Sequence, residues 1–377
     1  MKILFTGGVT GGHFYPIIAV AQAVREHAKE RRILPPLLYF MAPSEYNPRA
    51  LFDNEIEYMP IMAGKIRRYF SILNVIDIFK TFFGCIMALF KVFILYPDVV
   101  FGKGGFGSFP ALVAARILRI PTIIHESDGK PGRVNSWAGK FAEKIAISYP
   151  GAAQYFNTDK NKIAYTGNPV RKEIAKPLIA GAYELLHLEE GIPVILILGG
   201  SQGAVAINNV ILQTLSDLVE RFQIIHQTGK ANIEEVKATS SVILKDNSHA
   251  SRYHPMEYLN ELNLRMAAGT AEIVISRAGS TIFEIASWGL PSIIIPLPPS
   301  VSHDQTTNAL TYAQTGAASV IEENNLGAHI LIEEINRIHD NPVISQTMRD
   351  HAKAFSRPDS ADKIADAILD IALKHEK

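Results

Sequence analysis

The sequence predicts an α/β protein with two doubly wound, parallel-sheet domains. Three observations lead to this prediction. Short runs rich in Val and Ile alternate with helical patterns along the chain, and nearly every run ends in Gly, Ser, Thr or Asn, as in βαβ units. The 377 residues suffice for about two domains. Each half also begins with a strand that runs into a glycine-rich turn.

The expected strands follow one another in chain order, separated mostly by helical patterns. In the first half they comprise residues 2–5, 37–41, 57–61, 99–101, 122–125, 144–147 and 163–165. In the second half they comprise residues 194–198, 223–226, 273–276, 292–296 and 318–321. Three helical stretches come after Asn325, and the last, residues 359–373, is amphipathic and precedes no strand. We expect this last helix to pack on the first domain.

The domain boundary is expected between residues 167 and 192, where prolines and glycines occur without strong periodicity. This predicts an N-terminal domain of residues 1–168, joined by the C-terminal helix 359–377. The C-terminal domain then comprises residues 169–358.

Composition excludes several classes of protein. Lys+Arg and Asp+Glu both number 37, so a nucleic-acid partner is not expected. The 47% of hydrophobic residues against 20% charged excludes a disordered chain. The single Cys85 excludes an intramolecular disulfide and a Cys-based zinc site, and fits the cytoplasm. The apolar run at residues 3–5 is too short for a signal peptide, and no stretch is expected to reach the roughly 20 apolar residues of a membrane span.

Three glycine-rich turns, at residues 7–13, 102–110 and 199–204, each join a strand to a helix. Such turns can bind phosphate through backbone amides and the helix N-terminus, although glycine can also serve only a tight corner. Residues 102–107 fit the GxGxxG spacing of dinucleotide-binding proteins, and Glu126 ends the next strand. Because this is not the first strand-to-helix turn, we do not favour a nicotinamide cofactor.

The second half carries a further constellation at residues 276–296. Ser280 can cap a helix, and Glu284 lies in its first turns, where it can bind sugar hydroxyls or simply favour the helix dipole. Residues 302–309 bunch polar side chains after a strand, as in a ligand crevice or a capped polar loop. No Asp-x-Asp motif occurs. We therefore expect amides and a helix dipole, rather than a required metal, to hold the leaving group.

Six segments resemble the MurG family of peptidoglycan N-acetylglucosaminyltransferases, and they occur in the same order. They are GGVTGGHFYP, FGKGGFGSFPALVAARILRIPTIIHES, TGNPVR, GGSQGA, HQTGK and ISRAGSTIFEIASWGLPSIIIP. The resemblance extends from Met1 to about Ile321 and is weakest at residues 34–95 and after Asn325.

The resemblance implies a GT-B fold, with two Rossmann-like domains facing a deep cleft. It implies inverting transfer of GlcNAc from UDP-GlcNAc, bound by the C-terminal domain, to the MurNAc 4-hydroxyl of undecaprenyl-pyrophosphoryl-MurNAc-peptide (lipid I), giving lipid II. No cofactor is expected. The enzyme would serve peptidoglycan synthesis, cell shape and cell division from the cytoplasmic face of the plasma membrane, as a peripheral protein. Other cell-wall synthesis proteins are candidate partners.

The resemblance also implies the site residues. Substrate contacts are expected from Thr10, Gly11, Gly12, Asp128, Asn135, Arg171, Ser201, Leu259, Ala278, Gly279, Ser280, Glu284, Gln305 and Asn308. His13 resembles the family's usual candidate for general base; its ordinary pKa suits that task, although a helix start disfavours its protonated form. Glu126 and Asp128 are the alternative catalytic residues.

The chain departs from the family pattern at two places. Many members carry Asn where Asp128 stands, so acceptor contacts here can differ. The paired glutamines of some members are reduced to Gln305, preceded by Asp304, which bears on selectivity for GlcNAc.

Three other functions remain open at this point. They are a membrane-lipid glycosyltransferase of the diacylglycerol glucosyltransferase type, a UDP-GlcNAc 2-epimerase-like enzyme, and a non-enzymatic nucleotide-sugar scaffold. His13, Glu284 and Gln305 together argue against the scaffold.

The apolar segment 72–95 is predicted to be a helix that docks on an anionic membrane. At about 100° per residue, Lys80 and Lys91 share one side with Asp77 and Gly84. The expected core-facing stripe is Ile78, Phe82, Cys85 and Leu89. A second apolar flank, the expected docking surface, comprises Phe79, Phe83, Ile86, Phe90 and Ile94, with Lys65, Arg67 and Arg68 upstream. A neighbouring helix or a dimer partner could cover this flank instead.

Overall fold

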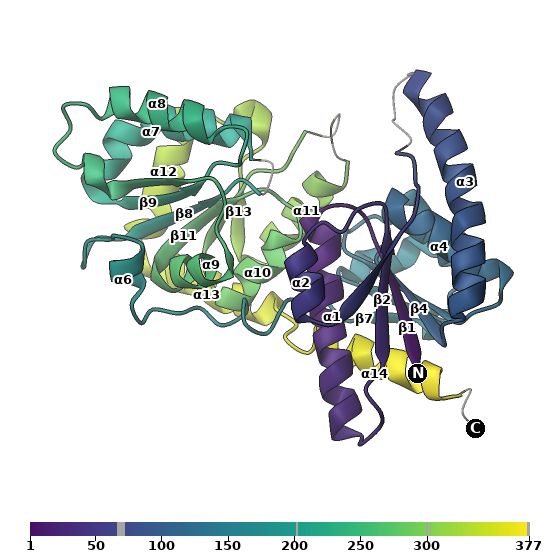
Figure 1. The fold of residues 1–377 in the computed structure, drawn as a ribbon. Coiled ribbons are helices and arrows are strands. Elements are labelled where there is room, and N and C mark those ends of the chain that lie inside the picture. Colours follow the sequence, from purple (N-terminus) through teal and green to yellow (C-terminus); the bar gives the residue numbers. More distant parts are fainter. Residues whose placement is uncertain (66–71, 201–202, 299–300, 302, 375–377) are drawn as a thin grey trace. The chain divides into compact units, whose positions relative to one another are not determined.

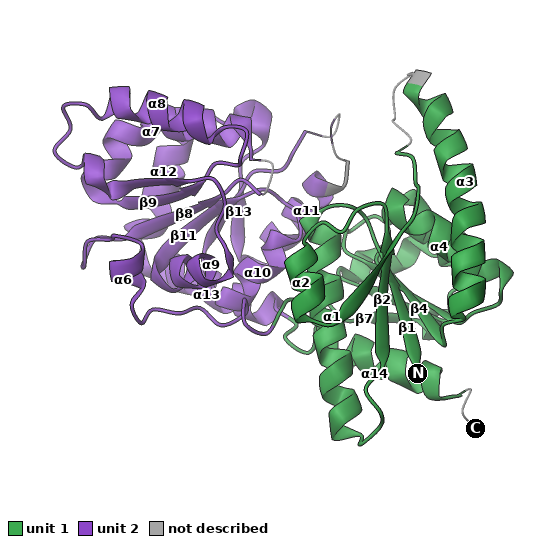
Figure 2. Ribbon diagram, viewed as in Figure 1, with its two compact units in different colours: residues 1–171, 357–377 green, residues 172–356 purple. Residues whose placement is uncertain are grey.

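The computed structural model describes residues 1–65, 72–200, 203–298, 301 and 303–374 (Figure 1). The chain divides into two compact units (Figure 2). Unit 1 comprises residues 1–171 and 357–377, and unit 2 comprises residues 172–356. The expected boundaries lay at residues 168 and 358, a few residues away.

Contacts on both sides of the boundary explain why unit 1 extends to residue 171 and resumes at residue 357. The Arg171 guanidinium stacks over the Tyr15 ring at 4.1 Å, and the Arg357 guanidinium lies 5.0 Å from the centre of the Tyr165 ring. Ser360 Oγ donates to the Gly167 carbonyl oxygen at 2.9 Å.

Within the described part of the chain, unit 1 contains a seven-stranded parallel sheet of order β3-β2-β1-β4-β5-β6-β7. Its strands are β1 (Lys2–Thr6), β2 (Leu37–Ala42), β3 (Ile56–Pro60), β4 (Val99–Gly102), β5 (Thr122–Glu126), β6 (Lys144–Ile147) and β7 (Ile163–Tyr165). Its helices are α1 (Gly11–Glu30), α2 (Pro48–Asp53), α3 (Ile72–Leu95), α4 (Phe109–Ile117), α5 (Arg133–Ala138) and α14 (Ser360–Leu373).

The strands of unit 1 alternate between two cores because successive side chains of a strand point to opposite faces. Ile3 and Phe5 pack in one core with α1, α2 and the C-terminal helix α14. Leu4 packs in the other core with α3, α4 and α5. The last helix of the chain therefore covers the same face of the first sheet as the first helix.

Unit 2 contains, among its described residues, a six-stranded parallel sheet of order β10-β9-β8-β11-β12-β13. Its strands are β8 (Val194–Leu198), β9 (Gln223–Gln227), β10 (Tyr253–Met256), β11 (Ala271–Ser276), β12 (Ser292–Ile294) and β13 (Ala318–Val320). Its helices are α6 (Ala182–Leu185), α7 (Val205–Arg221), α8 (Ile233–Ile243), α9 (Glu261–Thr270), α10 (Thr281–Trp288), α11 (His303–Ala313), α12 (Ala328–His339) and α13 (Pro342–Phe355). Figure 1 shows α7, α8 and α12 on one face of this sheet and α9 and α10 on the other.

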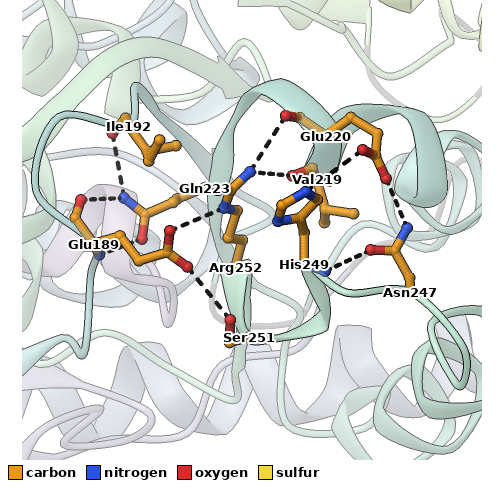
Figure 3. A network of polar contacts seen from close by, with 9 residues as sticks. All are labelled: Glu189, Ile192, Val219, Glu220, Gln223, Asn247, His249, Ser251 and Arg252. Atoms are coloured by element: carbon orange, nitrogen blue, oxygen red, sulfur yellow. Dashed lines mark hydrogen bonds and ion pairs between the residues drawn. The ribbon is translucent and has the colours of Figure 1, made fainter.

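A polar network at the amino-terminal ends of β9 and β10 fixes the segment that leads into β8 (Figure 3). The buried Gln223 side chain accepts from the Glu189 amide at 2.6 Å and donates to the carbonyl oxygens of Glu189 and Ile192. Arg252 pairs with Glu189 at 3.2 Å and donates to the Val219 carbonyl oxygen. This edge lies opposite the carboxyl ends of the strands, so the network supports the fold rather than a ligand site.

The face of α3 that packs on the protein is opposite to the expected one. Ile78 and Phe82, expected in the core stripe, are 55% and 58% exposed, while Cys85 and Leu89 are only partly buried. The buried face instead carries Asp77, Gly84, Ala88, Val92 and Leu95. A side chain at Gly84 would collide with the carbonyl oxygen of Met62, so small residues permit this close packing.

Candidate active site

Four loops follow the carboxyl ends of strands in unit 1, where open parallel sheets bind their ligands. They comprise residues 7–13 after β1, 103–108 after β4, 127–132 after β5 and 166–171 after β7. The first two are glycine-rich, and the predicted acceptor-side residues fall in these loops or beside them.

His13 lies in the first turn of α1, which begins after Thr10. Thr10 Oγ1 and His13 Nδ1 are 2.9 Å apart. A side chain at Gly8 would lie 2.9 Å from Nδ1, and one at Gly105 would lie 3.4 Å from Nε2, so the two glycines make room for the ring. Burial, and after it the charge of Lys103, lowers the pKa of His13 to about 4. The imidazole is therefore neutral at neutral pH and able to accept a proton.

Lys103, which was missed in the sequence, is a buried cation behind this loop, with 1% of its surface exposed. Its Nζ lies 2.7 Å from His125 Nδ1 and 3.0 Å from Asn168 Oδ1, and it also donates to Ser127 Oγ. Burial lowers its pKa, while Glu126 and Asp128 oppose that change. A lysine within a glycine-rich turn after a buried strand was the available sequence signal.

Glu126 is buried at the end of β5 and holds the loop that follows. Its Oε1 accepts from the Asp128 amide at 3.0 Å, and its Oε2 accepts from the Gly132 amide and from Asn135 Nδ2 at 3.1 and 2.9 Å. Burial, and after it Asp128, raises the pKa of Glu126. Glu126, one of the three predicted catalytic residues, thus uses both carboxylate oxygens within its own loop. Asp128, another of the three, is only half-buried.

Asn135, predicted to contact substrate, is 2% exposed. Its amide donates to the His125 carbonyl oxygen as well as to Glu126, so this side chain supports the loop. Gly11 and Gly12 open α1, and a side chain at Gly11 would lie 2.7 Å from the Tyr46 hydroxyl. Arg171 lies against Tyr15 in the same unit.

In unit 2, the loop after β8 begins at Gly199 and leads into α7. Ser201, a predicted substrate contact, lies outside the described residues. Behind the loop, His226 is buried between Asn208 Oδ1 at 3.0 Å and the Tyr253 hydroxyl at 2.8 Å, and burial lowers its pKa to about 3. Asn208 donates in turn to the Thr228 carbonyl oxygen at 3.1 Å, so a neutral histidine ties α7 to the loop after β9.

The loop after β11 contains the predicted phosphate-binding residues. Ala278 is buried, and Gly279 and Ser280 are partly exposed just before α10. Glu284 lies in the first turn of α10 and is half-buried. Asn308 is 1% exposed and donates to the Ala278 carbonyl oxygen at 3.2 Å, so it supports this loop.

Arg277 is a second residue that was missed in the sequence. It pairs with Glu323 at 2.5 Å and donates to the Ile295 carbonyl oxygen at 3.2 Å. These contacts brace the loop before α10 against the segments that follow β12 and β13. An arginine directly after a buried strand, at the start of the phosphate loop, was the sequence signal.

Two predicted substrate residues already use one hydrogen-bonding group within unit 2. Gln305 Oε1 accepts from the Leu297 amide at 3.0 Å. The backbone amide of Leu259 donates to Gln227 Oε1 at 3.2 Å.

Comparisons with known proteins identify the family of the chain. Residues 3–147 match the model of the glycosyltransferase family 28 N-terminal domain, and residues 194–364 match that of its C-terminal domain. A Treponema denticola protein named UDP-N-acetylglucosamine--N-acetylmuramyl-(pentapeptide) pyrophosphoryl-undecaprenol N-acetylglucosamine transferase is 34% identical over 342 residues, which cover 88% of this chain and 86% of that protein.

Solved structures with two different functions share this fold. MurG of Acinetobacter baumannii superposes with a TM-score of 0.71 at 24% identity, covering 98% of this chain and 99% of that one. UDP-GlcNAc 2-epimerase from Neisseria meningitidis, bound to UDP-GlcNAc, gives 0.67 at 16% identity, covering 98% and 100%. The superpositions establish the GT-B fold and leave function to the sequence relatives. With both domain models matched and a relative at 34% identity, the chain belongs to glycosyltransferase family 28 and, within it, to the MurG family.

Proposed function

We propose that this protein transfers GlcNAc from UDP-GlcNAc to the MurNAc 4-hydroxyl of lipid I, with inversion, to form lipid II. The observation that carries the proposal is the 34% identity to a named undecaprenol N-acetylglucosamine transferase over 88% of the chain. The loops at the carboxyl ends of both sheets supply the required groups: an imidazole, a helix-start glycine loop and a carboxylate in the first turn of a helix.

The donor is assigned to unit 2. The backbone amides of residues 278–280 and the start of α10 offer partial positive charge to the diphosphate, with Arg277 holding the loop from behind. Glu284, one turn further, binds ribose hydroxyls, and Gln305 binds the GlcNAc. No metal or other cofactor is required in this scheme, because amides and the helix dipole stabilise the leaving UDP.

The acceptor is assigned to unit 1, with His13 as the general base. When Nδ1–H donates to Thr10 Oγ1, Nε2 is the nitrogen that accepts a proton from the attacking hydroxyl. The lowered pKa of His13 keeps the ring in this neutral form. Asp128, partly exposed in the loop after β5, contacts the acceptor sugar.

Helix α3 docks the protein on the membrane that holds this acceptor. By length and composition, Leu73–Leu95 is apolar enough to cross a membrane, although no such segment was expected from the sequence. Asp77, Lys80 and Lys91 interrupt its apolar runs. One face packs on α4 and on residues 60–64, with Lys91 Nζ donating to the Pro60 carbonyl oxygen at 2.6 Å.

The opposite face of α3 is the proposed docking face. It consists of Ile78, Phe79, Phe82, Phe83, Ile86, Phe90, Phe93 and Ile94, each at least half exposed. An apolar face of this size marks an interaction site, and a helix with one packed face and one lipid-facing face lies on the membrane rather than across it. Lys65 is exposed, while Arg67 and Arg68 lie outside the described residues.

The fold itself also fits a 2-epimerase or another lipid glycosyltransferase, so the assay must separate the three. Purified full-length protein is incubated with labelled UDP-GlcNAc and a short-chain lipid I analogue, with and without a chelator. Formation of the labelled disaccharide lipid is expected, with no loss on chelation. Conversion of UDP-GlcNAc without acceptor would indicate the epimerase, and use of UDP-glucose with diacylglycerol would indicate the other transferase.

A further inference from the structure

Lys103 joins three segments of unit 1 through one buried ammonium group. The acceptors are His125 Nδ1 at the end of β5, Ser127 Oγ in the loop that follows, and Asn168 Oδ1 after β7. The scheme above gives this lysine no role.

The three partners of Lys103 match the three donors of an ammonium group. His125 Nε2 lies 3.0 Å from the Gly167 carbonyl oxygen, which can only accept, so Nε2 carries the proton. Burial, and after it Lys103, lowers the pKa of His125 well below its ordinary value, so Nδ1 of the neutral ring accepts. An ammonium group has three N–H donors, which match the three partners; a neutral amine has only two and would keep the third contact by accepting from the Ser127 hydroxyl.

Two buried ionisable side chains, Lys103 and Glu126, hold the Ser127–Asp128 turn. Lys103 holds it through the Ser127 hydroxyl, and Glu126 Oε1 holds it through the Asp128 amide at 3.0 Å. Lys103 and Glu126 are 1% and 4% exposed, whereas Ser127 and Asp128 are half-buried. The turn is therefore held from inside the protein by Lys103 and Glu126, while its own side chains are partly exposed.

We propose that Lys103 is a positioning residue for the acceptor: its ammonium group holds the Ser127–Asp128 turn in the place from which Asp128 contacts the lipid-linked sugar. The inference rests on the proposed function, because it takes the acceptor to bind unit 1. Removing the ammonium charge releases the turn and weakens acceptor binding, while the donor loops of unit 2 keep their own supports.

The test compares the two substrates in Lys103→Met, which keeps the length of the side chain and removes its charge. The KM for a short-chain lipid I analogue should rise roughly tenfold to hundredfold, as for loss of a charged hydrogen bond, and the KM for UDP-GlcNAc should stay within about twofold of the wild-type value. Lys140→Met, at an exposed lysine of the same unit, is the matched control and should change neither. Absence of transfer by the wild type would refute the proposed function, whereas an active wild type with an unchanged acceptor KM in Lys103→Met would refute this inference alone.

Ser127→Ala keeps the inference testable if Lys103→Met does not fold. It removes one acceptor of the ammonium group at a half-buried position and should raise the acceptor KM by roughly threefold or more. An acceptor KM that does not change in Ser127→Ala would overturn the inference.

The pH profile separates positioning by charge from simple packing. The titratable groups that face Lys103 are His13, His125, Glu126 and Asp128. Loss of the ammonium proton should raise the wild-type acceptor KM between about pH 6 and about pH 9, and the KM of Lys103→Met should be high and flat over that range. If the acceptor KM of Lys103→Met depended on pH as the wild-type KM does, the dependence would arise from the other titratable groups, and the role assigned to Lys103 would be wrong.

Discussion

Replacing two exposed aromatic residues of α3 should separate membrane binding from folding. Phe83 and Phe90 are 54% and 67% exposed. Because full burial of a Phe side chain stabilises by about 1.5–3 kcal/mol, these exposed fractions give about 2 to 3.5 kcal/mol together on entering a lipid interface. Phe83→Ser with Phe90→Ser should therefore weaken partitioning into anionic vesicles by roughly 20-fold to several hundredfold.

Cosedimentation with phosphatidylglycerol vesicles measures this partitioning, and turnover of long-chain lipid I in the same vesicles should slow in parallel. The free energy of unfolding should change by less than about 1 kcal/mol, as for exposed positions. Phe52→Ser, at an 82% exposed phenylalanine of α2, is the matched control and should bind vesicles normally. Unchanged vesicle binding by the double variant, or a large loss of its thermal stability, would refute the docking face.

Three further predictions concern individual ionisable groups. Glu284→Ala should raise the KM for UDP-GlcNAc roughly tenfold to hundredfold without lowering the melting temperature; an unchanged KM rejects the ribose contact. His13→Ala should lower kcat about 10²- to 10⁴-fold. Because the pKa of His13 is lowered to about 4, the wild-type kcat/KM should stay constant well below pH 6.5. A decline of kcat/KM already near that pH would argue against His13 as the general base. His27 contacts Asp366 and Asp362 of α14 at 2.7 and 3.2 Å, and although burial opposes it, their bonds and charges raise the pKa of His27. The stabilisation of the folded state by His27 is therefore full below pH 6.5 and is lost as the pH rises through the raised pKa. His27→Gln should lower the free energy of unfolding by roughly 1 kcal/mol in acid and by little in alkali, as measured by denaturant unfolding at both pH values. Equal losses at the two pH values would contradict this role of His27.

The sequence predicted most of the strands because each buried parallel strand is a short apolar run between turn residues. The exception is β10, whose sequence Tyr-His-Pro-Met is neither a run nor an alternation. It lies at the edge of the second sheet and pairs only with β9. Proline is tolerated at such an edge, so the pairing with β9 defines this strand and no local pattern does.

Periodicity placed α3 correctly as a helix but assigned its wrong face to the core. The prediction assumed that the apolar stripe opposite Lys80 and Lys91 packs inside, whereas the packed face carries Gly84, Ala88 and the buried Asp77. Close approach to residues 60–64 requires small side chains there, and polar contacts such as Thr81 Oγ1 with the Gly64 amide at 3.0 Å compensate the buried polar groups. An apolar stripe is equally compatible with a protein core and with lipid, so helical periodicity alone does not distinguish them.

The loops of the candidate site could be predicted because glycines that follow buried strands can be read directly from the sequence. The side chains that support these loops could not be predicted in this way. Lys103 and Asn308 act through partners 24 and 30 residues away in the chain, and only the fold brings these together. The consequence for the acceptor side is electrostatic. Asp128 raises the pKa of Glu126 and also opposes the lowering of that of Lys103, so a carboxylate at this position strengthens the case for a charged lysine beneath the turn. Burial, and after it the charge of the same lysine, lowers the pKa of His13. In the proposed scheme, Lys103 therefore supports the turn that carries Asp128 and also favours the neutral form of His13, and these residues are expected to behave as a coupled set rather than as independent sites.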